Sequence, residues 1–470
     1  MILGDLMLKD LIGNKAFYKK LFVLMMPIMI QNGITNFVNM LDNIMIGAVG
    51  TAEMTGVAVT NQLMFVFNLC IFGAVSGAGI FGAQFFGNKD YKGVRYTLRF
   101  KLIFGLILCI LGILLFVFCG EWLINMYMQG DEGVTDPIAT LGYAKSYLFI
   151  MLIGLIPYTI VQCYSSTLRE GGYPNLPMLA GVVAVVVNLV LNYILIFGKF
   201  GAPILGVDGA AIATVISRFA ELLIVIFAVH FNTKKYSFIK GLYKSLYVPK
   251  SLIIGLFLKG LPLMLNETMW ASGVAVVNQC YSVRGLDAVA AGNIQQTFWN
   301  VFSIAYMAVG VSIGIILGQM LGANQLTEAK KASYKMIAFS FFVATIIGII
   351  YIVVAEFIPM AYNTEPEIRS LATTLMQITA IVMPFEALTH ATYFTLRSGG
   401  KMFVTFIFDC GFMWGANVLT AFTLSRFTNI PFIWLFATVQ GIALIKSIFG
   451  VILVRNGFWI KNIIADKNKT

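Results

Sequence analysis

Acidic side chains lie inside long apolar runs of this 470-residue sequence, where they could bind and release a small cation. Asp42 lies in NFVNMLDNIMIG (36–47), Glu267 in LPLMLNETMW (261–270), and Glu386 in the run that ends in TLRSGG. A carboxylate in such a run usually faces a polar interior and serves a function, because its burial in hydrocarbon is costly. The three acids are predicted to bind H⁺ or, as metal ligands, Na⁺.

Further polar residues share a helix face with Asp42. At 100° per residue, an arc of about 120° holds Asn32, Thr35, Asn36, Asn39, Asp42 and Asn43. This stripe predicts a helix that turns one face to a cavity, where Asn36 and Asn39 would bind an organic substrate. The alternative is a seam of asparagines that only joins helices.

Amide groups recur one turn apart in NLVLN (188–192), where Asn188 and Asn192 can offer carbonyl oxygens to a cation or to a drug. The next apolar run carries Arg218 and Glu221 three residues apart. Their spacing predicts a local ion pair with a structural role.

Aromatic and amide side chains accompany the acids of the second half. Trp270 and Asn278 share a face with Glu267, His390 follows Glu386 by one turn, and Gln295 and Trp299 share a third face. Such groups suit amphipathic organic cations, so these five residues are predicted to bind substrate. A plain packing stripe is an equally good interpretation of Gln295 and Trp299.

The elements that position these residues are membrane-spanning helices. The sequence is 59% hydrophobic and 11% charged, with a mean hydropathy of +0.86, so its solvent is a bilayer. Barrel-type alternation is absent from the sequence, which leaves helices as the spanning elements. The predicted spans are 21–47, 54–83, 98–119, 141–167, 176–198, 206–230, 252–282, 289–318, 334–360, 371–396, 402–424 and 431–455.

The net charge of +11 does not indicate a nucleic-acid partner. If the N-terminus is cytoplasmic and twelve spans follow, most of the 32 Lys and Arg residues fall in the cytoplasmic segments. The outer loop 120–140 contains Asp and Glu but no Lys or Arg. This asymmetry is the positive-inside bias. We therefore expect a multi-pass protein of the cytoplasmic membrane, surrounded by lipid, with both termini cytoplasmic and no cleavable signal peptide.

The two halves of the sequence repeat each other. The shift that places Pro262 on Pro27 also places Gln319 on Gln84 and Gly322 on Gly87. Since each half has an even number of spans, the halves are parallel repeats with pseudo-two-fold symmetry about the membrane normal. The predicted parts are a cytoplasmic N-terminal segment (1–20), a six-helix N-lobe (21–230), a basic linker (231–251), a six-helix C-lobe (252–457) and a cytoplasmic tail (458–470). Such a two-lobe chain can act as a monomer.

Enzyme and ATPase motifs are absent from the sequence. It contains no G-x-x-x-x-G-K-[ST], no H-E-x-x-H and no G-x-S-x-G. The glycine-rich stretch GAVSGAGIFGAQFFG (73–87) lies in an apolar span, which predicts close helix packing rather than phosphate binding. We expect no catalytic residues and no cofactor, and uphill transport would use an ion gradient.

The order and spacing of several short motifs resemble the multidrug and toxic compound extrusion (MATE) transporters. The resemblance covers about residues 20–455. The motifs that carry it are P-x14-D (Pro27, Asp42), GAQFFG, LREGGYPNLPM (168–178), NLVLN, GVDGAAIATVIS (206–217) and LRSGGK (396–401).

The resemblance implies a two-lobe antiporter that exports cationic or amphipathic drugs by alternating access, in exchange for H⁺ or Na⁺. Similarity to the DinF-like branch implies cation coupling at Asp42, Asn188, Asn192 and Thr214, although Asn192 stands where that branch often has a second carboxylate. Similarity to the NorM-like branch implies a C-lobe cation site at Glu267 and Glu386.

A flippase for a lipid-linked oligosaccharide or another lipid, built on a related two-lobe fold, is the alternative function. Such a protein should have a more strongly basic cleft to bind a pyrophosphate. The clearest basic residues within the spans are Arg218 and Lys446.

Overall fold

The computed structural model describes residues 11–128, 136–362 and 364–465, apart from the side chains of Asn39, Asn43, Tyr127 and Ala361. The regular elements of these residues are all helices, and twelve of them are long and apolar enough to cross a membrane. The predicted all-α polytopic fold is confirmed. The predicted N-terminal segment, the loop 120–140 and the C-terminal tail lie partly outside the described residues.

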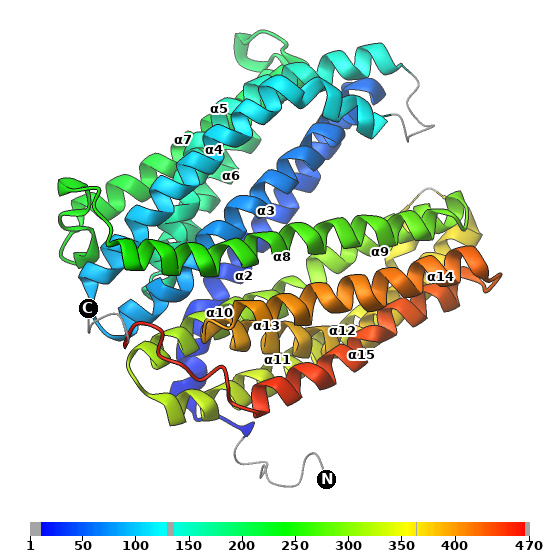
Figure 1. Cartoon of the computed structure of the whole chain (residues 1–470). Coiled ribbons are helices and arrows are strands. Elements are labelled where there is room, and N and C mark those ends of the chain that lie inside the picture. The colour runs from blue at the N-terminus through cyan, green and yellow to red at the C-terminus, as the bar shows by residue number, and fades with distance from the viewer. Residues whose placement is uncertain (1–10, 129–135, 363, 466–470) are drawn as a thin grey trace. The chain divides into compact units, whose positions relative to one another are not determined.

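Long helices follow one another along the chain, with two short 3₁₀ turns in the segment 232–249 (Figure 1). In chain order they are α2 (Lys15–Gly47), α3 (Thr51–Gly87), α4 (Tyr91–Met128), α5 (Pro137–Glu170), α6 (Asn175–Phe197), α7 (Gly206–Phe231), α8 (Lys250–Ser282), α9 (Leu286–Phe302), α10 (Ile304–Gly322), α11 (Leu326–Val354), α12 (Pro366–Ser398), α13 (Met402–Phe406), α14 (Leu419–Phe427) and α15 (Phe432–Arg455). Between α13 and α14 the helix continues through two π-helical stretches, Ile407–Gly411 and Met413–Val418.

Several helices extend beyond the predicted spans. Helix α4 begins at Tyr91 and ends at Met128, where 98–119 was predicted, because hydropathy marks only the part of a helix that suits hydrocarbon. The predicted limit of 360 for the ninth span was wrong. Helix α11 ends at Val354, and a 3₁₀ turn at Ile358–Ala361 follows around a proline, which cannot continue the α-helical hydrogen bonds.

The eighth span, predicted as one helix over 289–318, is interrupted. Helix α9 ends at Phe302 and α10 begins at Ile304, with Ser303 between them. The hydroxyl of Ser303 donates to the backbone carbonyl of Asn300 across 3.4 Å. Ser303 keeps a right-handed helical conformation, and its backbone N–H still donates to the carbonyl of Trp299 across 2.9 Å, so the interruption is confined to this residue.

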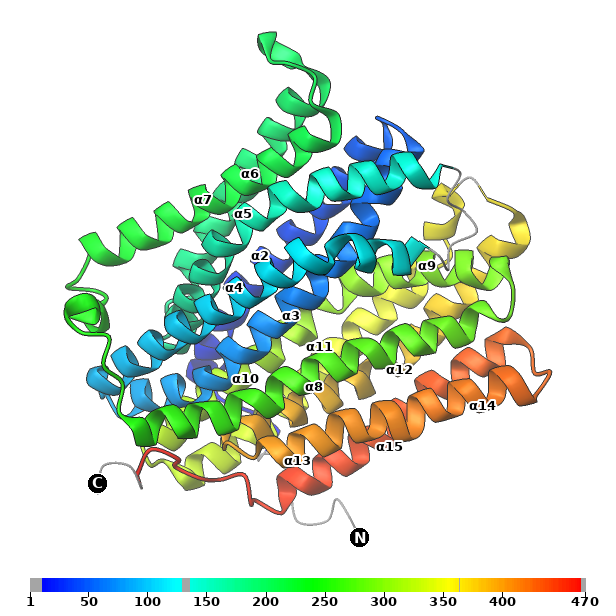
Figure 2. The same ribbon diagram turned by 45° about the horizontal axis from the view of Figure 1, so that its top comes forward.

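The helices group into two compact units. The N-unit comprises Ile30–Gly82 and Asp90–Met264, and the C-unit comprises the described residues of Met1–Met29, Ala83–Lys89 and Leu265–Thr470. Within the N-unit α4, α5, α6 and α7 run alongside one another, and within the C-unit α11, α12 and α15 do the same (Figure 2). The lobe bounds 21–230 and 252–457 remain a prediction.

Prolines mark where two helices pass from one unit to the other. Helix α2 leaves the C-unit after Met29, close to Pro27, and α8 leaves the N-unit after Met264, close to Pro262. These are the two prolines that the internal repeat superposes. A proline inside a helix removes one backbone hydrogen bond and favours a bend. Both halves therefore have a proline that favours a bend at the equivalent position of their first helix.

The glycines of the stretch 73–87 allow close packing inside the N-unit, as predicted. A methyl group added at Gly73 would meet the backbone of Met264, and one added at Gly79 or Gly82 would meet the carboxylate of Glu170. The small residues let α3 approach α8 and α5 closely, in the manner of packed membrane helices.

Candidate functional site

The candidate site in the N-unit is a polar cluster around Asp42. Nδ2 of Asn192 on α6 donates to Oδ1 of Asp42 on α2 across 2.6 Å. The same nitrogen lies 3.3 Å from Oδ1 of Asn188, one turn earlier on α6. Nδ2 of Asn188 is in turn 3.2 Å from the hydroxyl oxygen of Thr214 on α7. The structure thus brings together the four residues Asp42, Asn188, Asn192 and Thr214.

The amide of Asn188 can join this cluster in two orientations. Turned over, its nitrogen lies 3.2 Å from both carboxylate oxygens of Asp42 while its oxygen accepts from Thr214. The orientation of such an amide follows from its hydrogen bonds, because nitrogen and oxygen are nearly equivalent in shape. In the turned orientation two amide groups hold Asp42.

The cluster around Asp42 has the chemistry of a small-cation site. Among the described residues, no Lys or Arg forms an ion pair with Asp42. Oδ1 of Asn192 is buried and accepts no hydrogen bond from any described residue. Carboxylate, amide and hydroxyl oxygens are hard ligands that suit Na⁺, and a carboxylate alone suits H⁺.

Arg218 lies on α7, one turn after Thr214, but the predicted ion pair with Glu221 was wrong. Within the described part of the chain no ion pair joins the two residues. The guanidinium instead lies 5.2 Å from the ring centroid of Tyr158 on α5, a cation–π arrangement. Its Nη1 is buried without a hydrogen-bond partner among the described residues.

Glu267 on α8 belongs to a charged network of the C-unit. The hydroxyl of Tyr393 donates to its Oε1 across 3.4 Å, and Nη1 of Arg397 lies 3.9 Å from the same oxygen. Tyr393 and Arg397 are one turn apart on α12. A cation therefore already lies beside this carboxylate, in contrast to Asp42.

Asp409 continues this network and was missed by the sequence analysis. Nζ of Lys446 on α15 lies 2.6 Å from its Oδ1, and Nδ2 of Asn266 donates to its Oδ2 across 2.9 Å. The same amide of Asn266 lies 3.3 Å from the hydroxyl of Tyr393, which connects Asp409 to Glu267. Asp409 lies in the π-helical stretch Ile407–Gly411, and such stretches are frequent at functional sites.

Glu386 on α12 lies in a separate, aromatic pocket of the C-unit. Its Oε2 accepts from Nε1 of Trp299 and from the hydroxyl of Tyr306, both across 3.1 Å. The ring of His390 packs against Tyr306 and Tyr393, with centroids 6.1 and 6.5 Å apart. Trp299 and His390, both predicted to bind substrate, thus lie close to Glu386, and the contact of Trp299 with Glu386 was not predicted from the sequence.

The other predicted substrate residues are dispersed. Gln295 is only 4% exposed and donates to the hydroxyl of Thr379, so it packs inside the C-unit. Trp270 is half-buried and Asn278 is exposed, both on α8. Asn36 on α2 is half-buried, and the side chain of Asn39 lies outside the described residues.

No group of three or more His, Cys, Asp or Glu side chains that could hold a metal ion occurs in the described ranges. Asp42 and Glu386 each lie in a cluster of their own, and Glu267 and Asp409 share a network with Arg397 and Lys446. A cation at Asp42 would therefore depend on one carboxylate and on neutral oxygens.

Comparison with known proteins identifies relatives over almost the whole chain. The MatE family model matches residues 27–194 and 262–423, two segments that begin at the repeated prolines. A "Probable multidrug resistance protein NorM" of Thermotoga maritima is 25% identical over 462 residues, covering 96% of this chain and 95% of the relative. A "Multidrug resistance protein MdtK" of Pectobacterium atrosepticum is 26% identical over 372 residues, covering 78% of this chain and 79% of the relative.

Solved structures share the fold at low sequence identity. An outward-facing multidrug resistance MATE family transporter of the MOP superfamily superposes with a TM-score of 0.82 at 17% identity, covering 95% of this chain and 97% of that one. A MOP superfamily transporter from Pyrococcus furiosus gives a TM-score of 0.85 at 17% identity, with the same coverage. The two-lobe MATE fold is thereby confirmed. The described residues form twelve helices that are long and apolar enough to cross a membrane, and the sequence repeats internally. Together with a family match over most of the chain, these features show that it belongs to the MatE family of membrane transporters, and not to a class of enzymes.

Proposed function

We propose that this protein is a multidrug exporter that exchanges amphipathic organic cations for H⁺ or Na⁺ by alternating access, with the coupling cation bound at Asp42. The relatives named as multidrug resistance proteins support the export of drugs. We further propose that the chain lies in the cytoplasmic membrane with both termini cytoplasmic, on the basis of its positively charged inner loops. Because one chain contains both lobes, we propose that it acts as a monomer.

The observation that carries this proposal is the hydrogen bond from Asn192 to Asp42. The 2.6 Å hydrogen bond orients the carboxylate of Asp42 but supplies no positive charge. A cation that binds there therefore competes with no charged side chain of the hydrogen-bonded cluster. In the C-unit, Asp409 lies 2.6 Å from Lys446 and Glu267 lies 3.9 Å from Arg397. A cation binding there would have to compete with these side chains.

Coupling requires that the cation bind one conformation more tightly than the other, because a ligand shifts an equilibrium only through its differential affinity. A cluster whose carboxylate comes from α2 and whose amides come from α6 can change its geometry when the helices move. We propose that the cation-bound cluster favours the conformation that releases the drug. Glu386, Trp299 and His390 would then contribute to the drug site, where aromatic rings suit an organic cation.

The pairing of Lys446 in the C-unit argues against the alternative function, a flippase for a lipid-linked oligosaccharide. Its pyrophosphate would need cations that are not already neutralised, whereas Lys446 lies in an ion pair with Asp409. The drug exporter needs no such cation.

The test is dye efflux from proteoliposomes under an imposed pH gradient or an imposed Na⁺ gradient. Asp42→Asn should abolish ion-driven efflux, while Glu267→Gln should keep the ion dependence and change only the half-saturating dye concentration. Asp287→Asn, at an exposed aspartate in the first turn of α9, is the matched control and should transport normally. Full ion-driven efflux by Asp42→Asn would overturn the proposal.

A further inference from the structure

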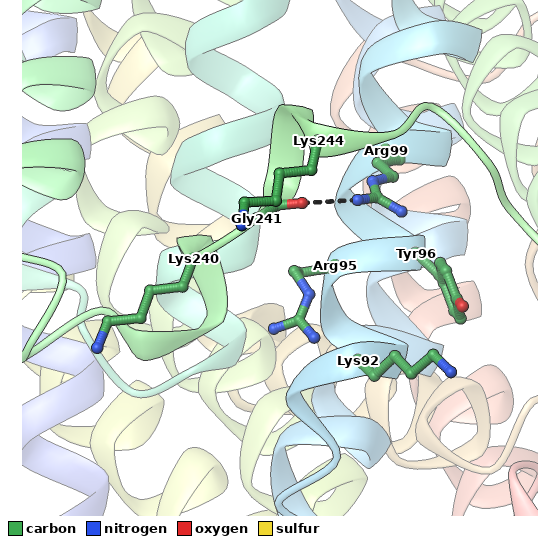
Figure 3. A pocket seen from close by; sticks show the side chains of 7 residues that line it. All are labelled: Lys92, Arg95, Tyr96, Arg99, Lys240, Gly241 and Lys244. Carbon is green, nitrogen blue, oxygen red and sulfur yellow. Dashed lines mark hydrogen bonds between the residues drawn. The ribbon is translucent and has the colours of Figure 1, made fainter.

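A basic pocket lies in the N-unit beside the first turns of α4 (Figure 3). Its cavity volume is about 550 Å³. Residues of the first three turns of α4 line one side, and the segment between α7 and α8 lines the other. The lining residues are Lys92, Arg95, Tyr96, Arg99, Lys240, Gly241 and Lys244.

Five of these seven lining residues are cations, and none is an acid. Among the described residues, Lys92, Arg95, Lys240 and Lys244 form no ion pair. The neighbouring acid Asp90 is engaged elsewhere, since its carboxylate accepts from the backbone N–H groups of Lys92 and Gly93. The positive charge of the pocket is therefore not neutralised by the protein around it.

The helix itself adds to this positive potential. Lys92 and Arg95 lie in the first two turns of α4, where the partial positive charge of the helix N-terminus disfavours cations. A bound anion would relieve both the repulsion among the side chains and their repulsion by the helix. The arrangement is costly without a ligand and favourable with one.

The pocket is also held in shape. The guanidinium of Arg99, only 7% exposed, donates to the carbonyl oxygens of Leu242, Tyr247 and Gly241 across 2.7, 3.0 and 2.8 Å. Figure 3 shows this contact with Gly241, and Lys240 and Lys244 on either side of it. Arg99 thus fixes the segment that carries these two lysines against α4. Because Arg99 is engaged in this way, Lys92, Arg95, Lys240 and Lys244 are the cations that can contact a ligand.

Aromatic and apolar groups border the pocket on one side. The ring of Tyr96 lies beneath Lys92 and Arg99, at 5.9 and 5.8 Å from its centroid, and meets the ring of Tyr247 at 6.3 Å. Leu246 and Tyr247 are exposed. An anion with an attached apolar chain could therefore place its charge among the cations and its chain over these side chains.

We propose that this pocket binds a phosphate group, carried by an anionic phospholipid of the cytoplasmic leaflet or by a soluble phosphate compound. Lys and Arg are the side chains that bind phosphate, Arg by two parallel hydrogen bonds and Lys as a point charge. The bound phosphate joins α4 to the segment that leads to α8 and stabilises the N-unit. The site is separate from the cluster around Asp42 and does not depend on the transported compound.

The test uses the full-length protein in detergent and three probes, namely phosphatidylglycerol, phosphatidylcholine and inorganic pyrophosphate, with binding followed by native mass spectrometry. The pocket variant is Arg95→Gln/Lys240→Gln/Lys244→Gln, which keeps the structural Arg99. The matched control is Lys234→Gln/Lys235→Gln/Lys250→Gln, which removes the same charge from exposed lysines of the same unit outside the pocket.

We expect saturable binding of phosphatidylglycerol or pyrophosphate, weakened at least about tenfold in the pocket variant and less than about twofold in the control, since only the pocket variant removes cations that contact the phosphate. Binding of phosphatidylglycerol alone identifies a lipid, and binding of pyrophosphate identifies a soluble phosphate compound. Equal weakening in both variants, equal binding of phosphatidylcholine, or no saturable binding of either phosphate probe would overturn the proposal. If the triple variant does not give a monodisperse protein, the single variants Lys240→Gln and Lys244→Gln carry the same comparison.

Discussion

Asn192 on α6 holds the carboxylate of Asp42 on α2 by a hydrogen bond of 2.6 Å from Nδ2, while its own side-chain oxygen stays buried without a partner among the described residues. One amide thus orients the acid and also leaves an acceptor beside it. A buried acceptor without a partner is costly in free energy, and a cation in the cluster would satisfy it. This relationship makes Asn192 the most informative position for testing the cluster.

The variant Asn192→Ala should weaken cation binding without removing the charge of Asp42. It deletes both the 2.6 Å donor and the unsatisfied oxygen, so we expect the cation concentration for half-maximal efflux to rise about tenfold, which corresponds to about 1.4 kcal/mol. The maximal rate at saturating cation should change less than this concentration. The measurement is dye efflux from proteoliposomes against a series of external cation concentrations.

A control for this prediction is Asn232→Ala, at an exposed asparagine that follows α7 in the same unit. It should leave the half-maximal concentration unchanged. An Asn192→Ala protein with the wild-type cation dependence would show that the amide only packs α6 against α2.

Lys446 and Asp409 should behave as a coupled pair in the C-unit. Lys446→Met leaves the carboxylate of Asp409, 18% exposed, without its cation, and we expect a loss of about 1–3 kcal/mol in the free energy of unfolding. Adding Asp409→Asn should restore most of this loss, because the uncompensated charge is gone. Thermal unfolding of the single and double variants in detergent measures the coupling, and additive losses would contradict it.

The helical spans and the two halves of the chain could be predicted from the sequence. Hydropathy and internal similarity depend only on short stretches of residues and need no knowledge of contacts between distant ones. A family resemblance grouped Asp42, Asn188, Asn192 and Thr214, although their motifs lie far apart along the chain, and the structure places their side chains in contact. Their role in cation coupling stays a prediction. Asp409 was missed. Its partners Lys446 and Asn266 lie on other helices, so the sequence carries no spacing that joins them.

Side-chain direction accounts for the remaining differences. Gln295 shares a helix face with Trp299 in the sequence, yet it is buried against Thr379 while Trp299 reaches Glu386. Arg218 and Glu221 have the spacing of an ion pair, but the ring of Tyr158 takes the guanidinium instead. A lone Asp in the apolar run 402–424 was the one available signal for Asp409, because intramembrane acids are rare.

Two Lys–Glu pairs of the same length should differ widely in their effect on stability. Nζ of Lys101 lies 2.6 Å from Glu170 with side chains 0% and 6% exposed, whereas Lys145 lies 2.6 Å from Glu121 with side chains 38% and 58% exposed. Glu170→Gln leaves a buried ammonium without its counter-charge, and we expect a loss of about 3–5 kcal/mol. Glu121→Gln should cost less than about 1 kcal/mol, because water screens the exposed pair.

The comparison is made by thermal unfolding of the two purified variants in the same detergent. Similar melting temperatures for both would show that Lys101 finds a sufficient substitute in the hydroxyls of Ser166 and Thr167, each 3.2 Å from its Nζ.

Two glycine-to-alanine substitutions should have opposite effects on stability, because one glycine lies against Glu170 and the other has open space around it. A methyl group at Gly82 would collide with the Glu170 carboxylate, which cannot move aside without leaving Lys101, so Gly82→Ala should destabilise the protein by about 1–3 kcal/mol. Gly142 lies inside α5 with no atom within 4 Å of an added methyl group, and Gly142→Ala should stabilise it by up to about 1 kcal/mol through helix propensity. Thermal unfolding in detergent distinguishes the two. A neutral Gly82→Ala would mean that the helices can separate at this point, and the packing assigned to the glycine-rich stretch would then be wrong.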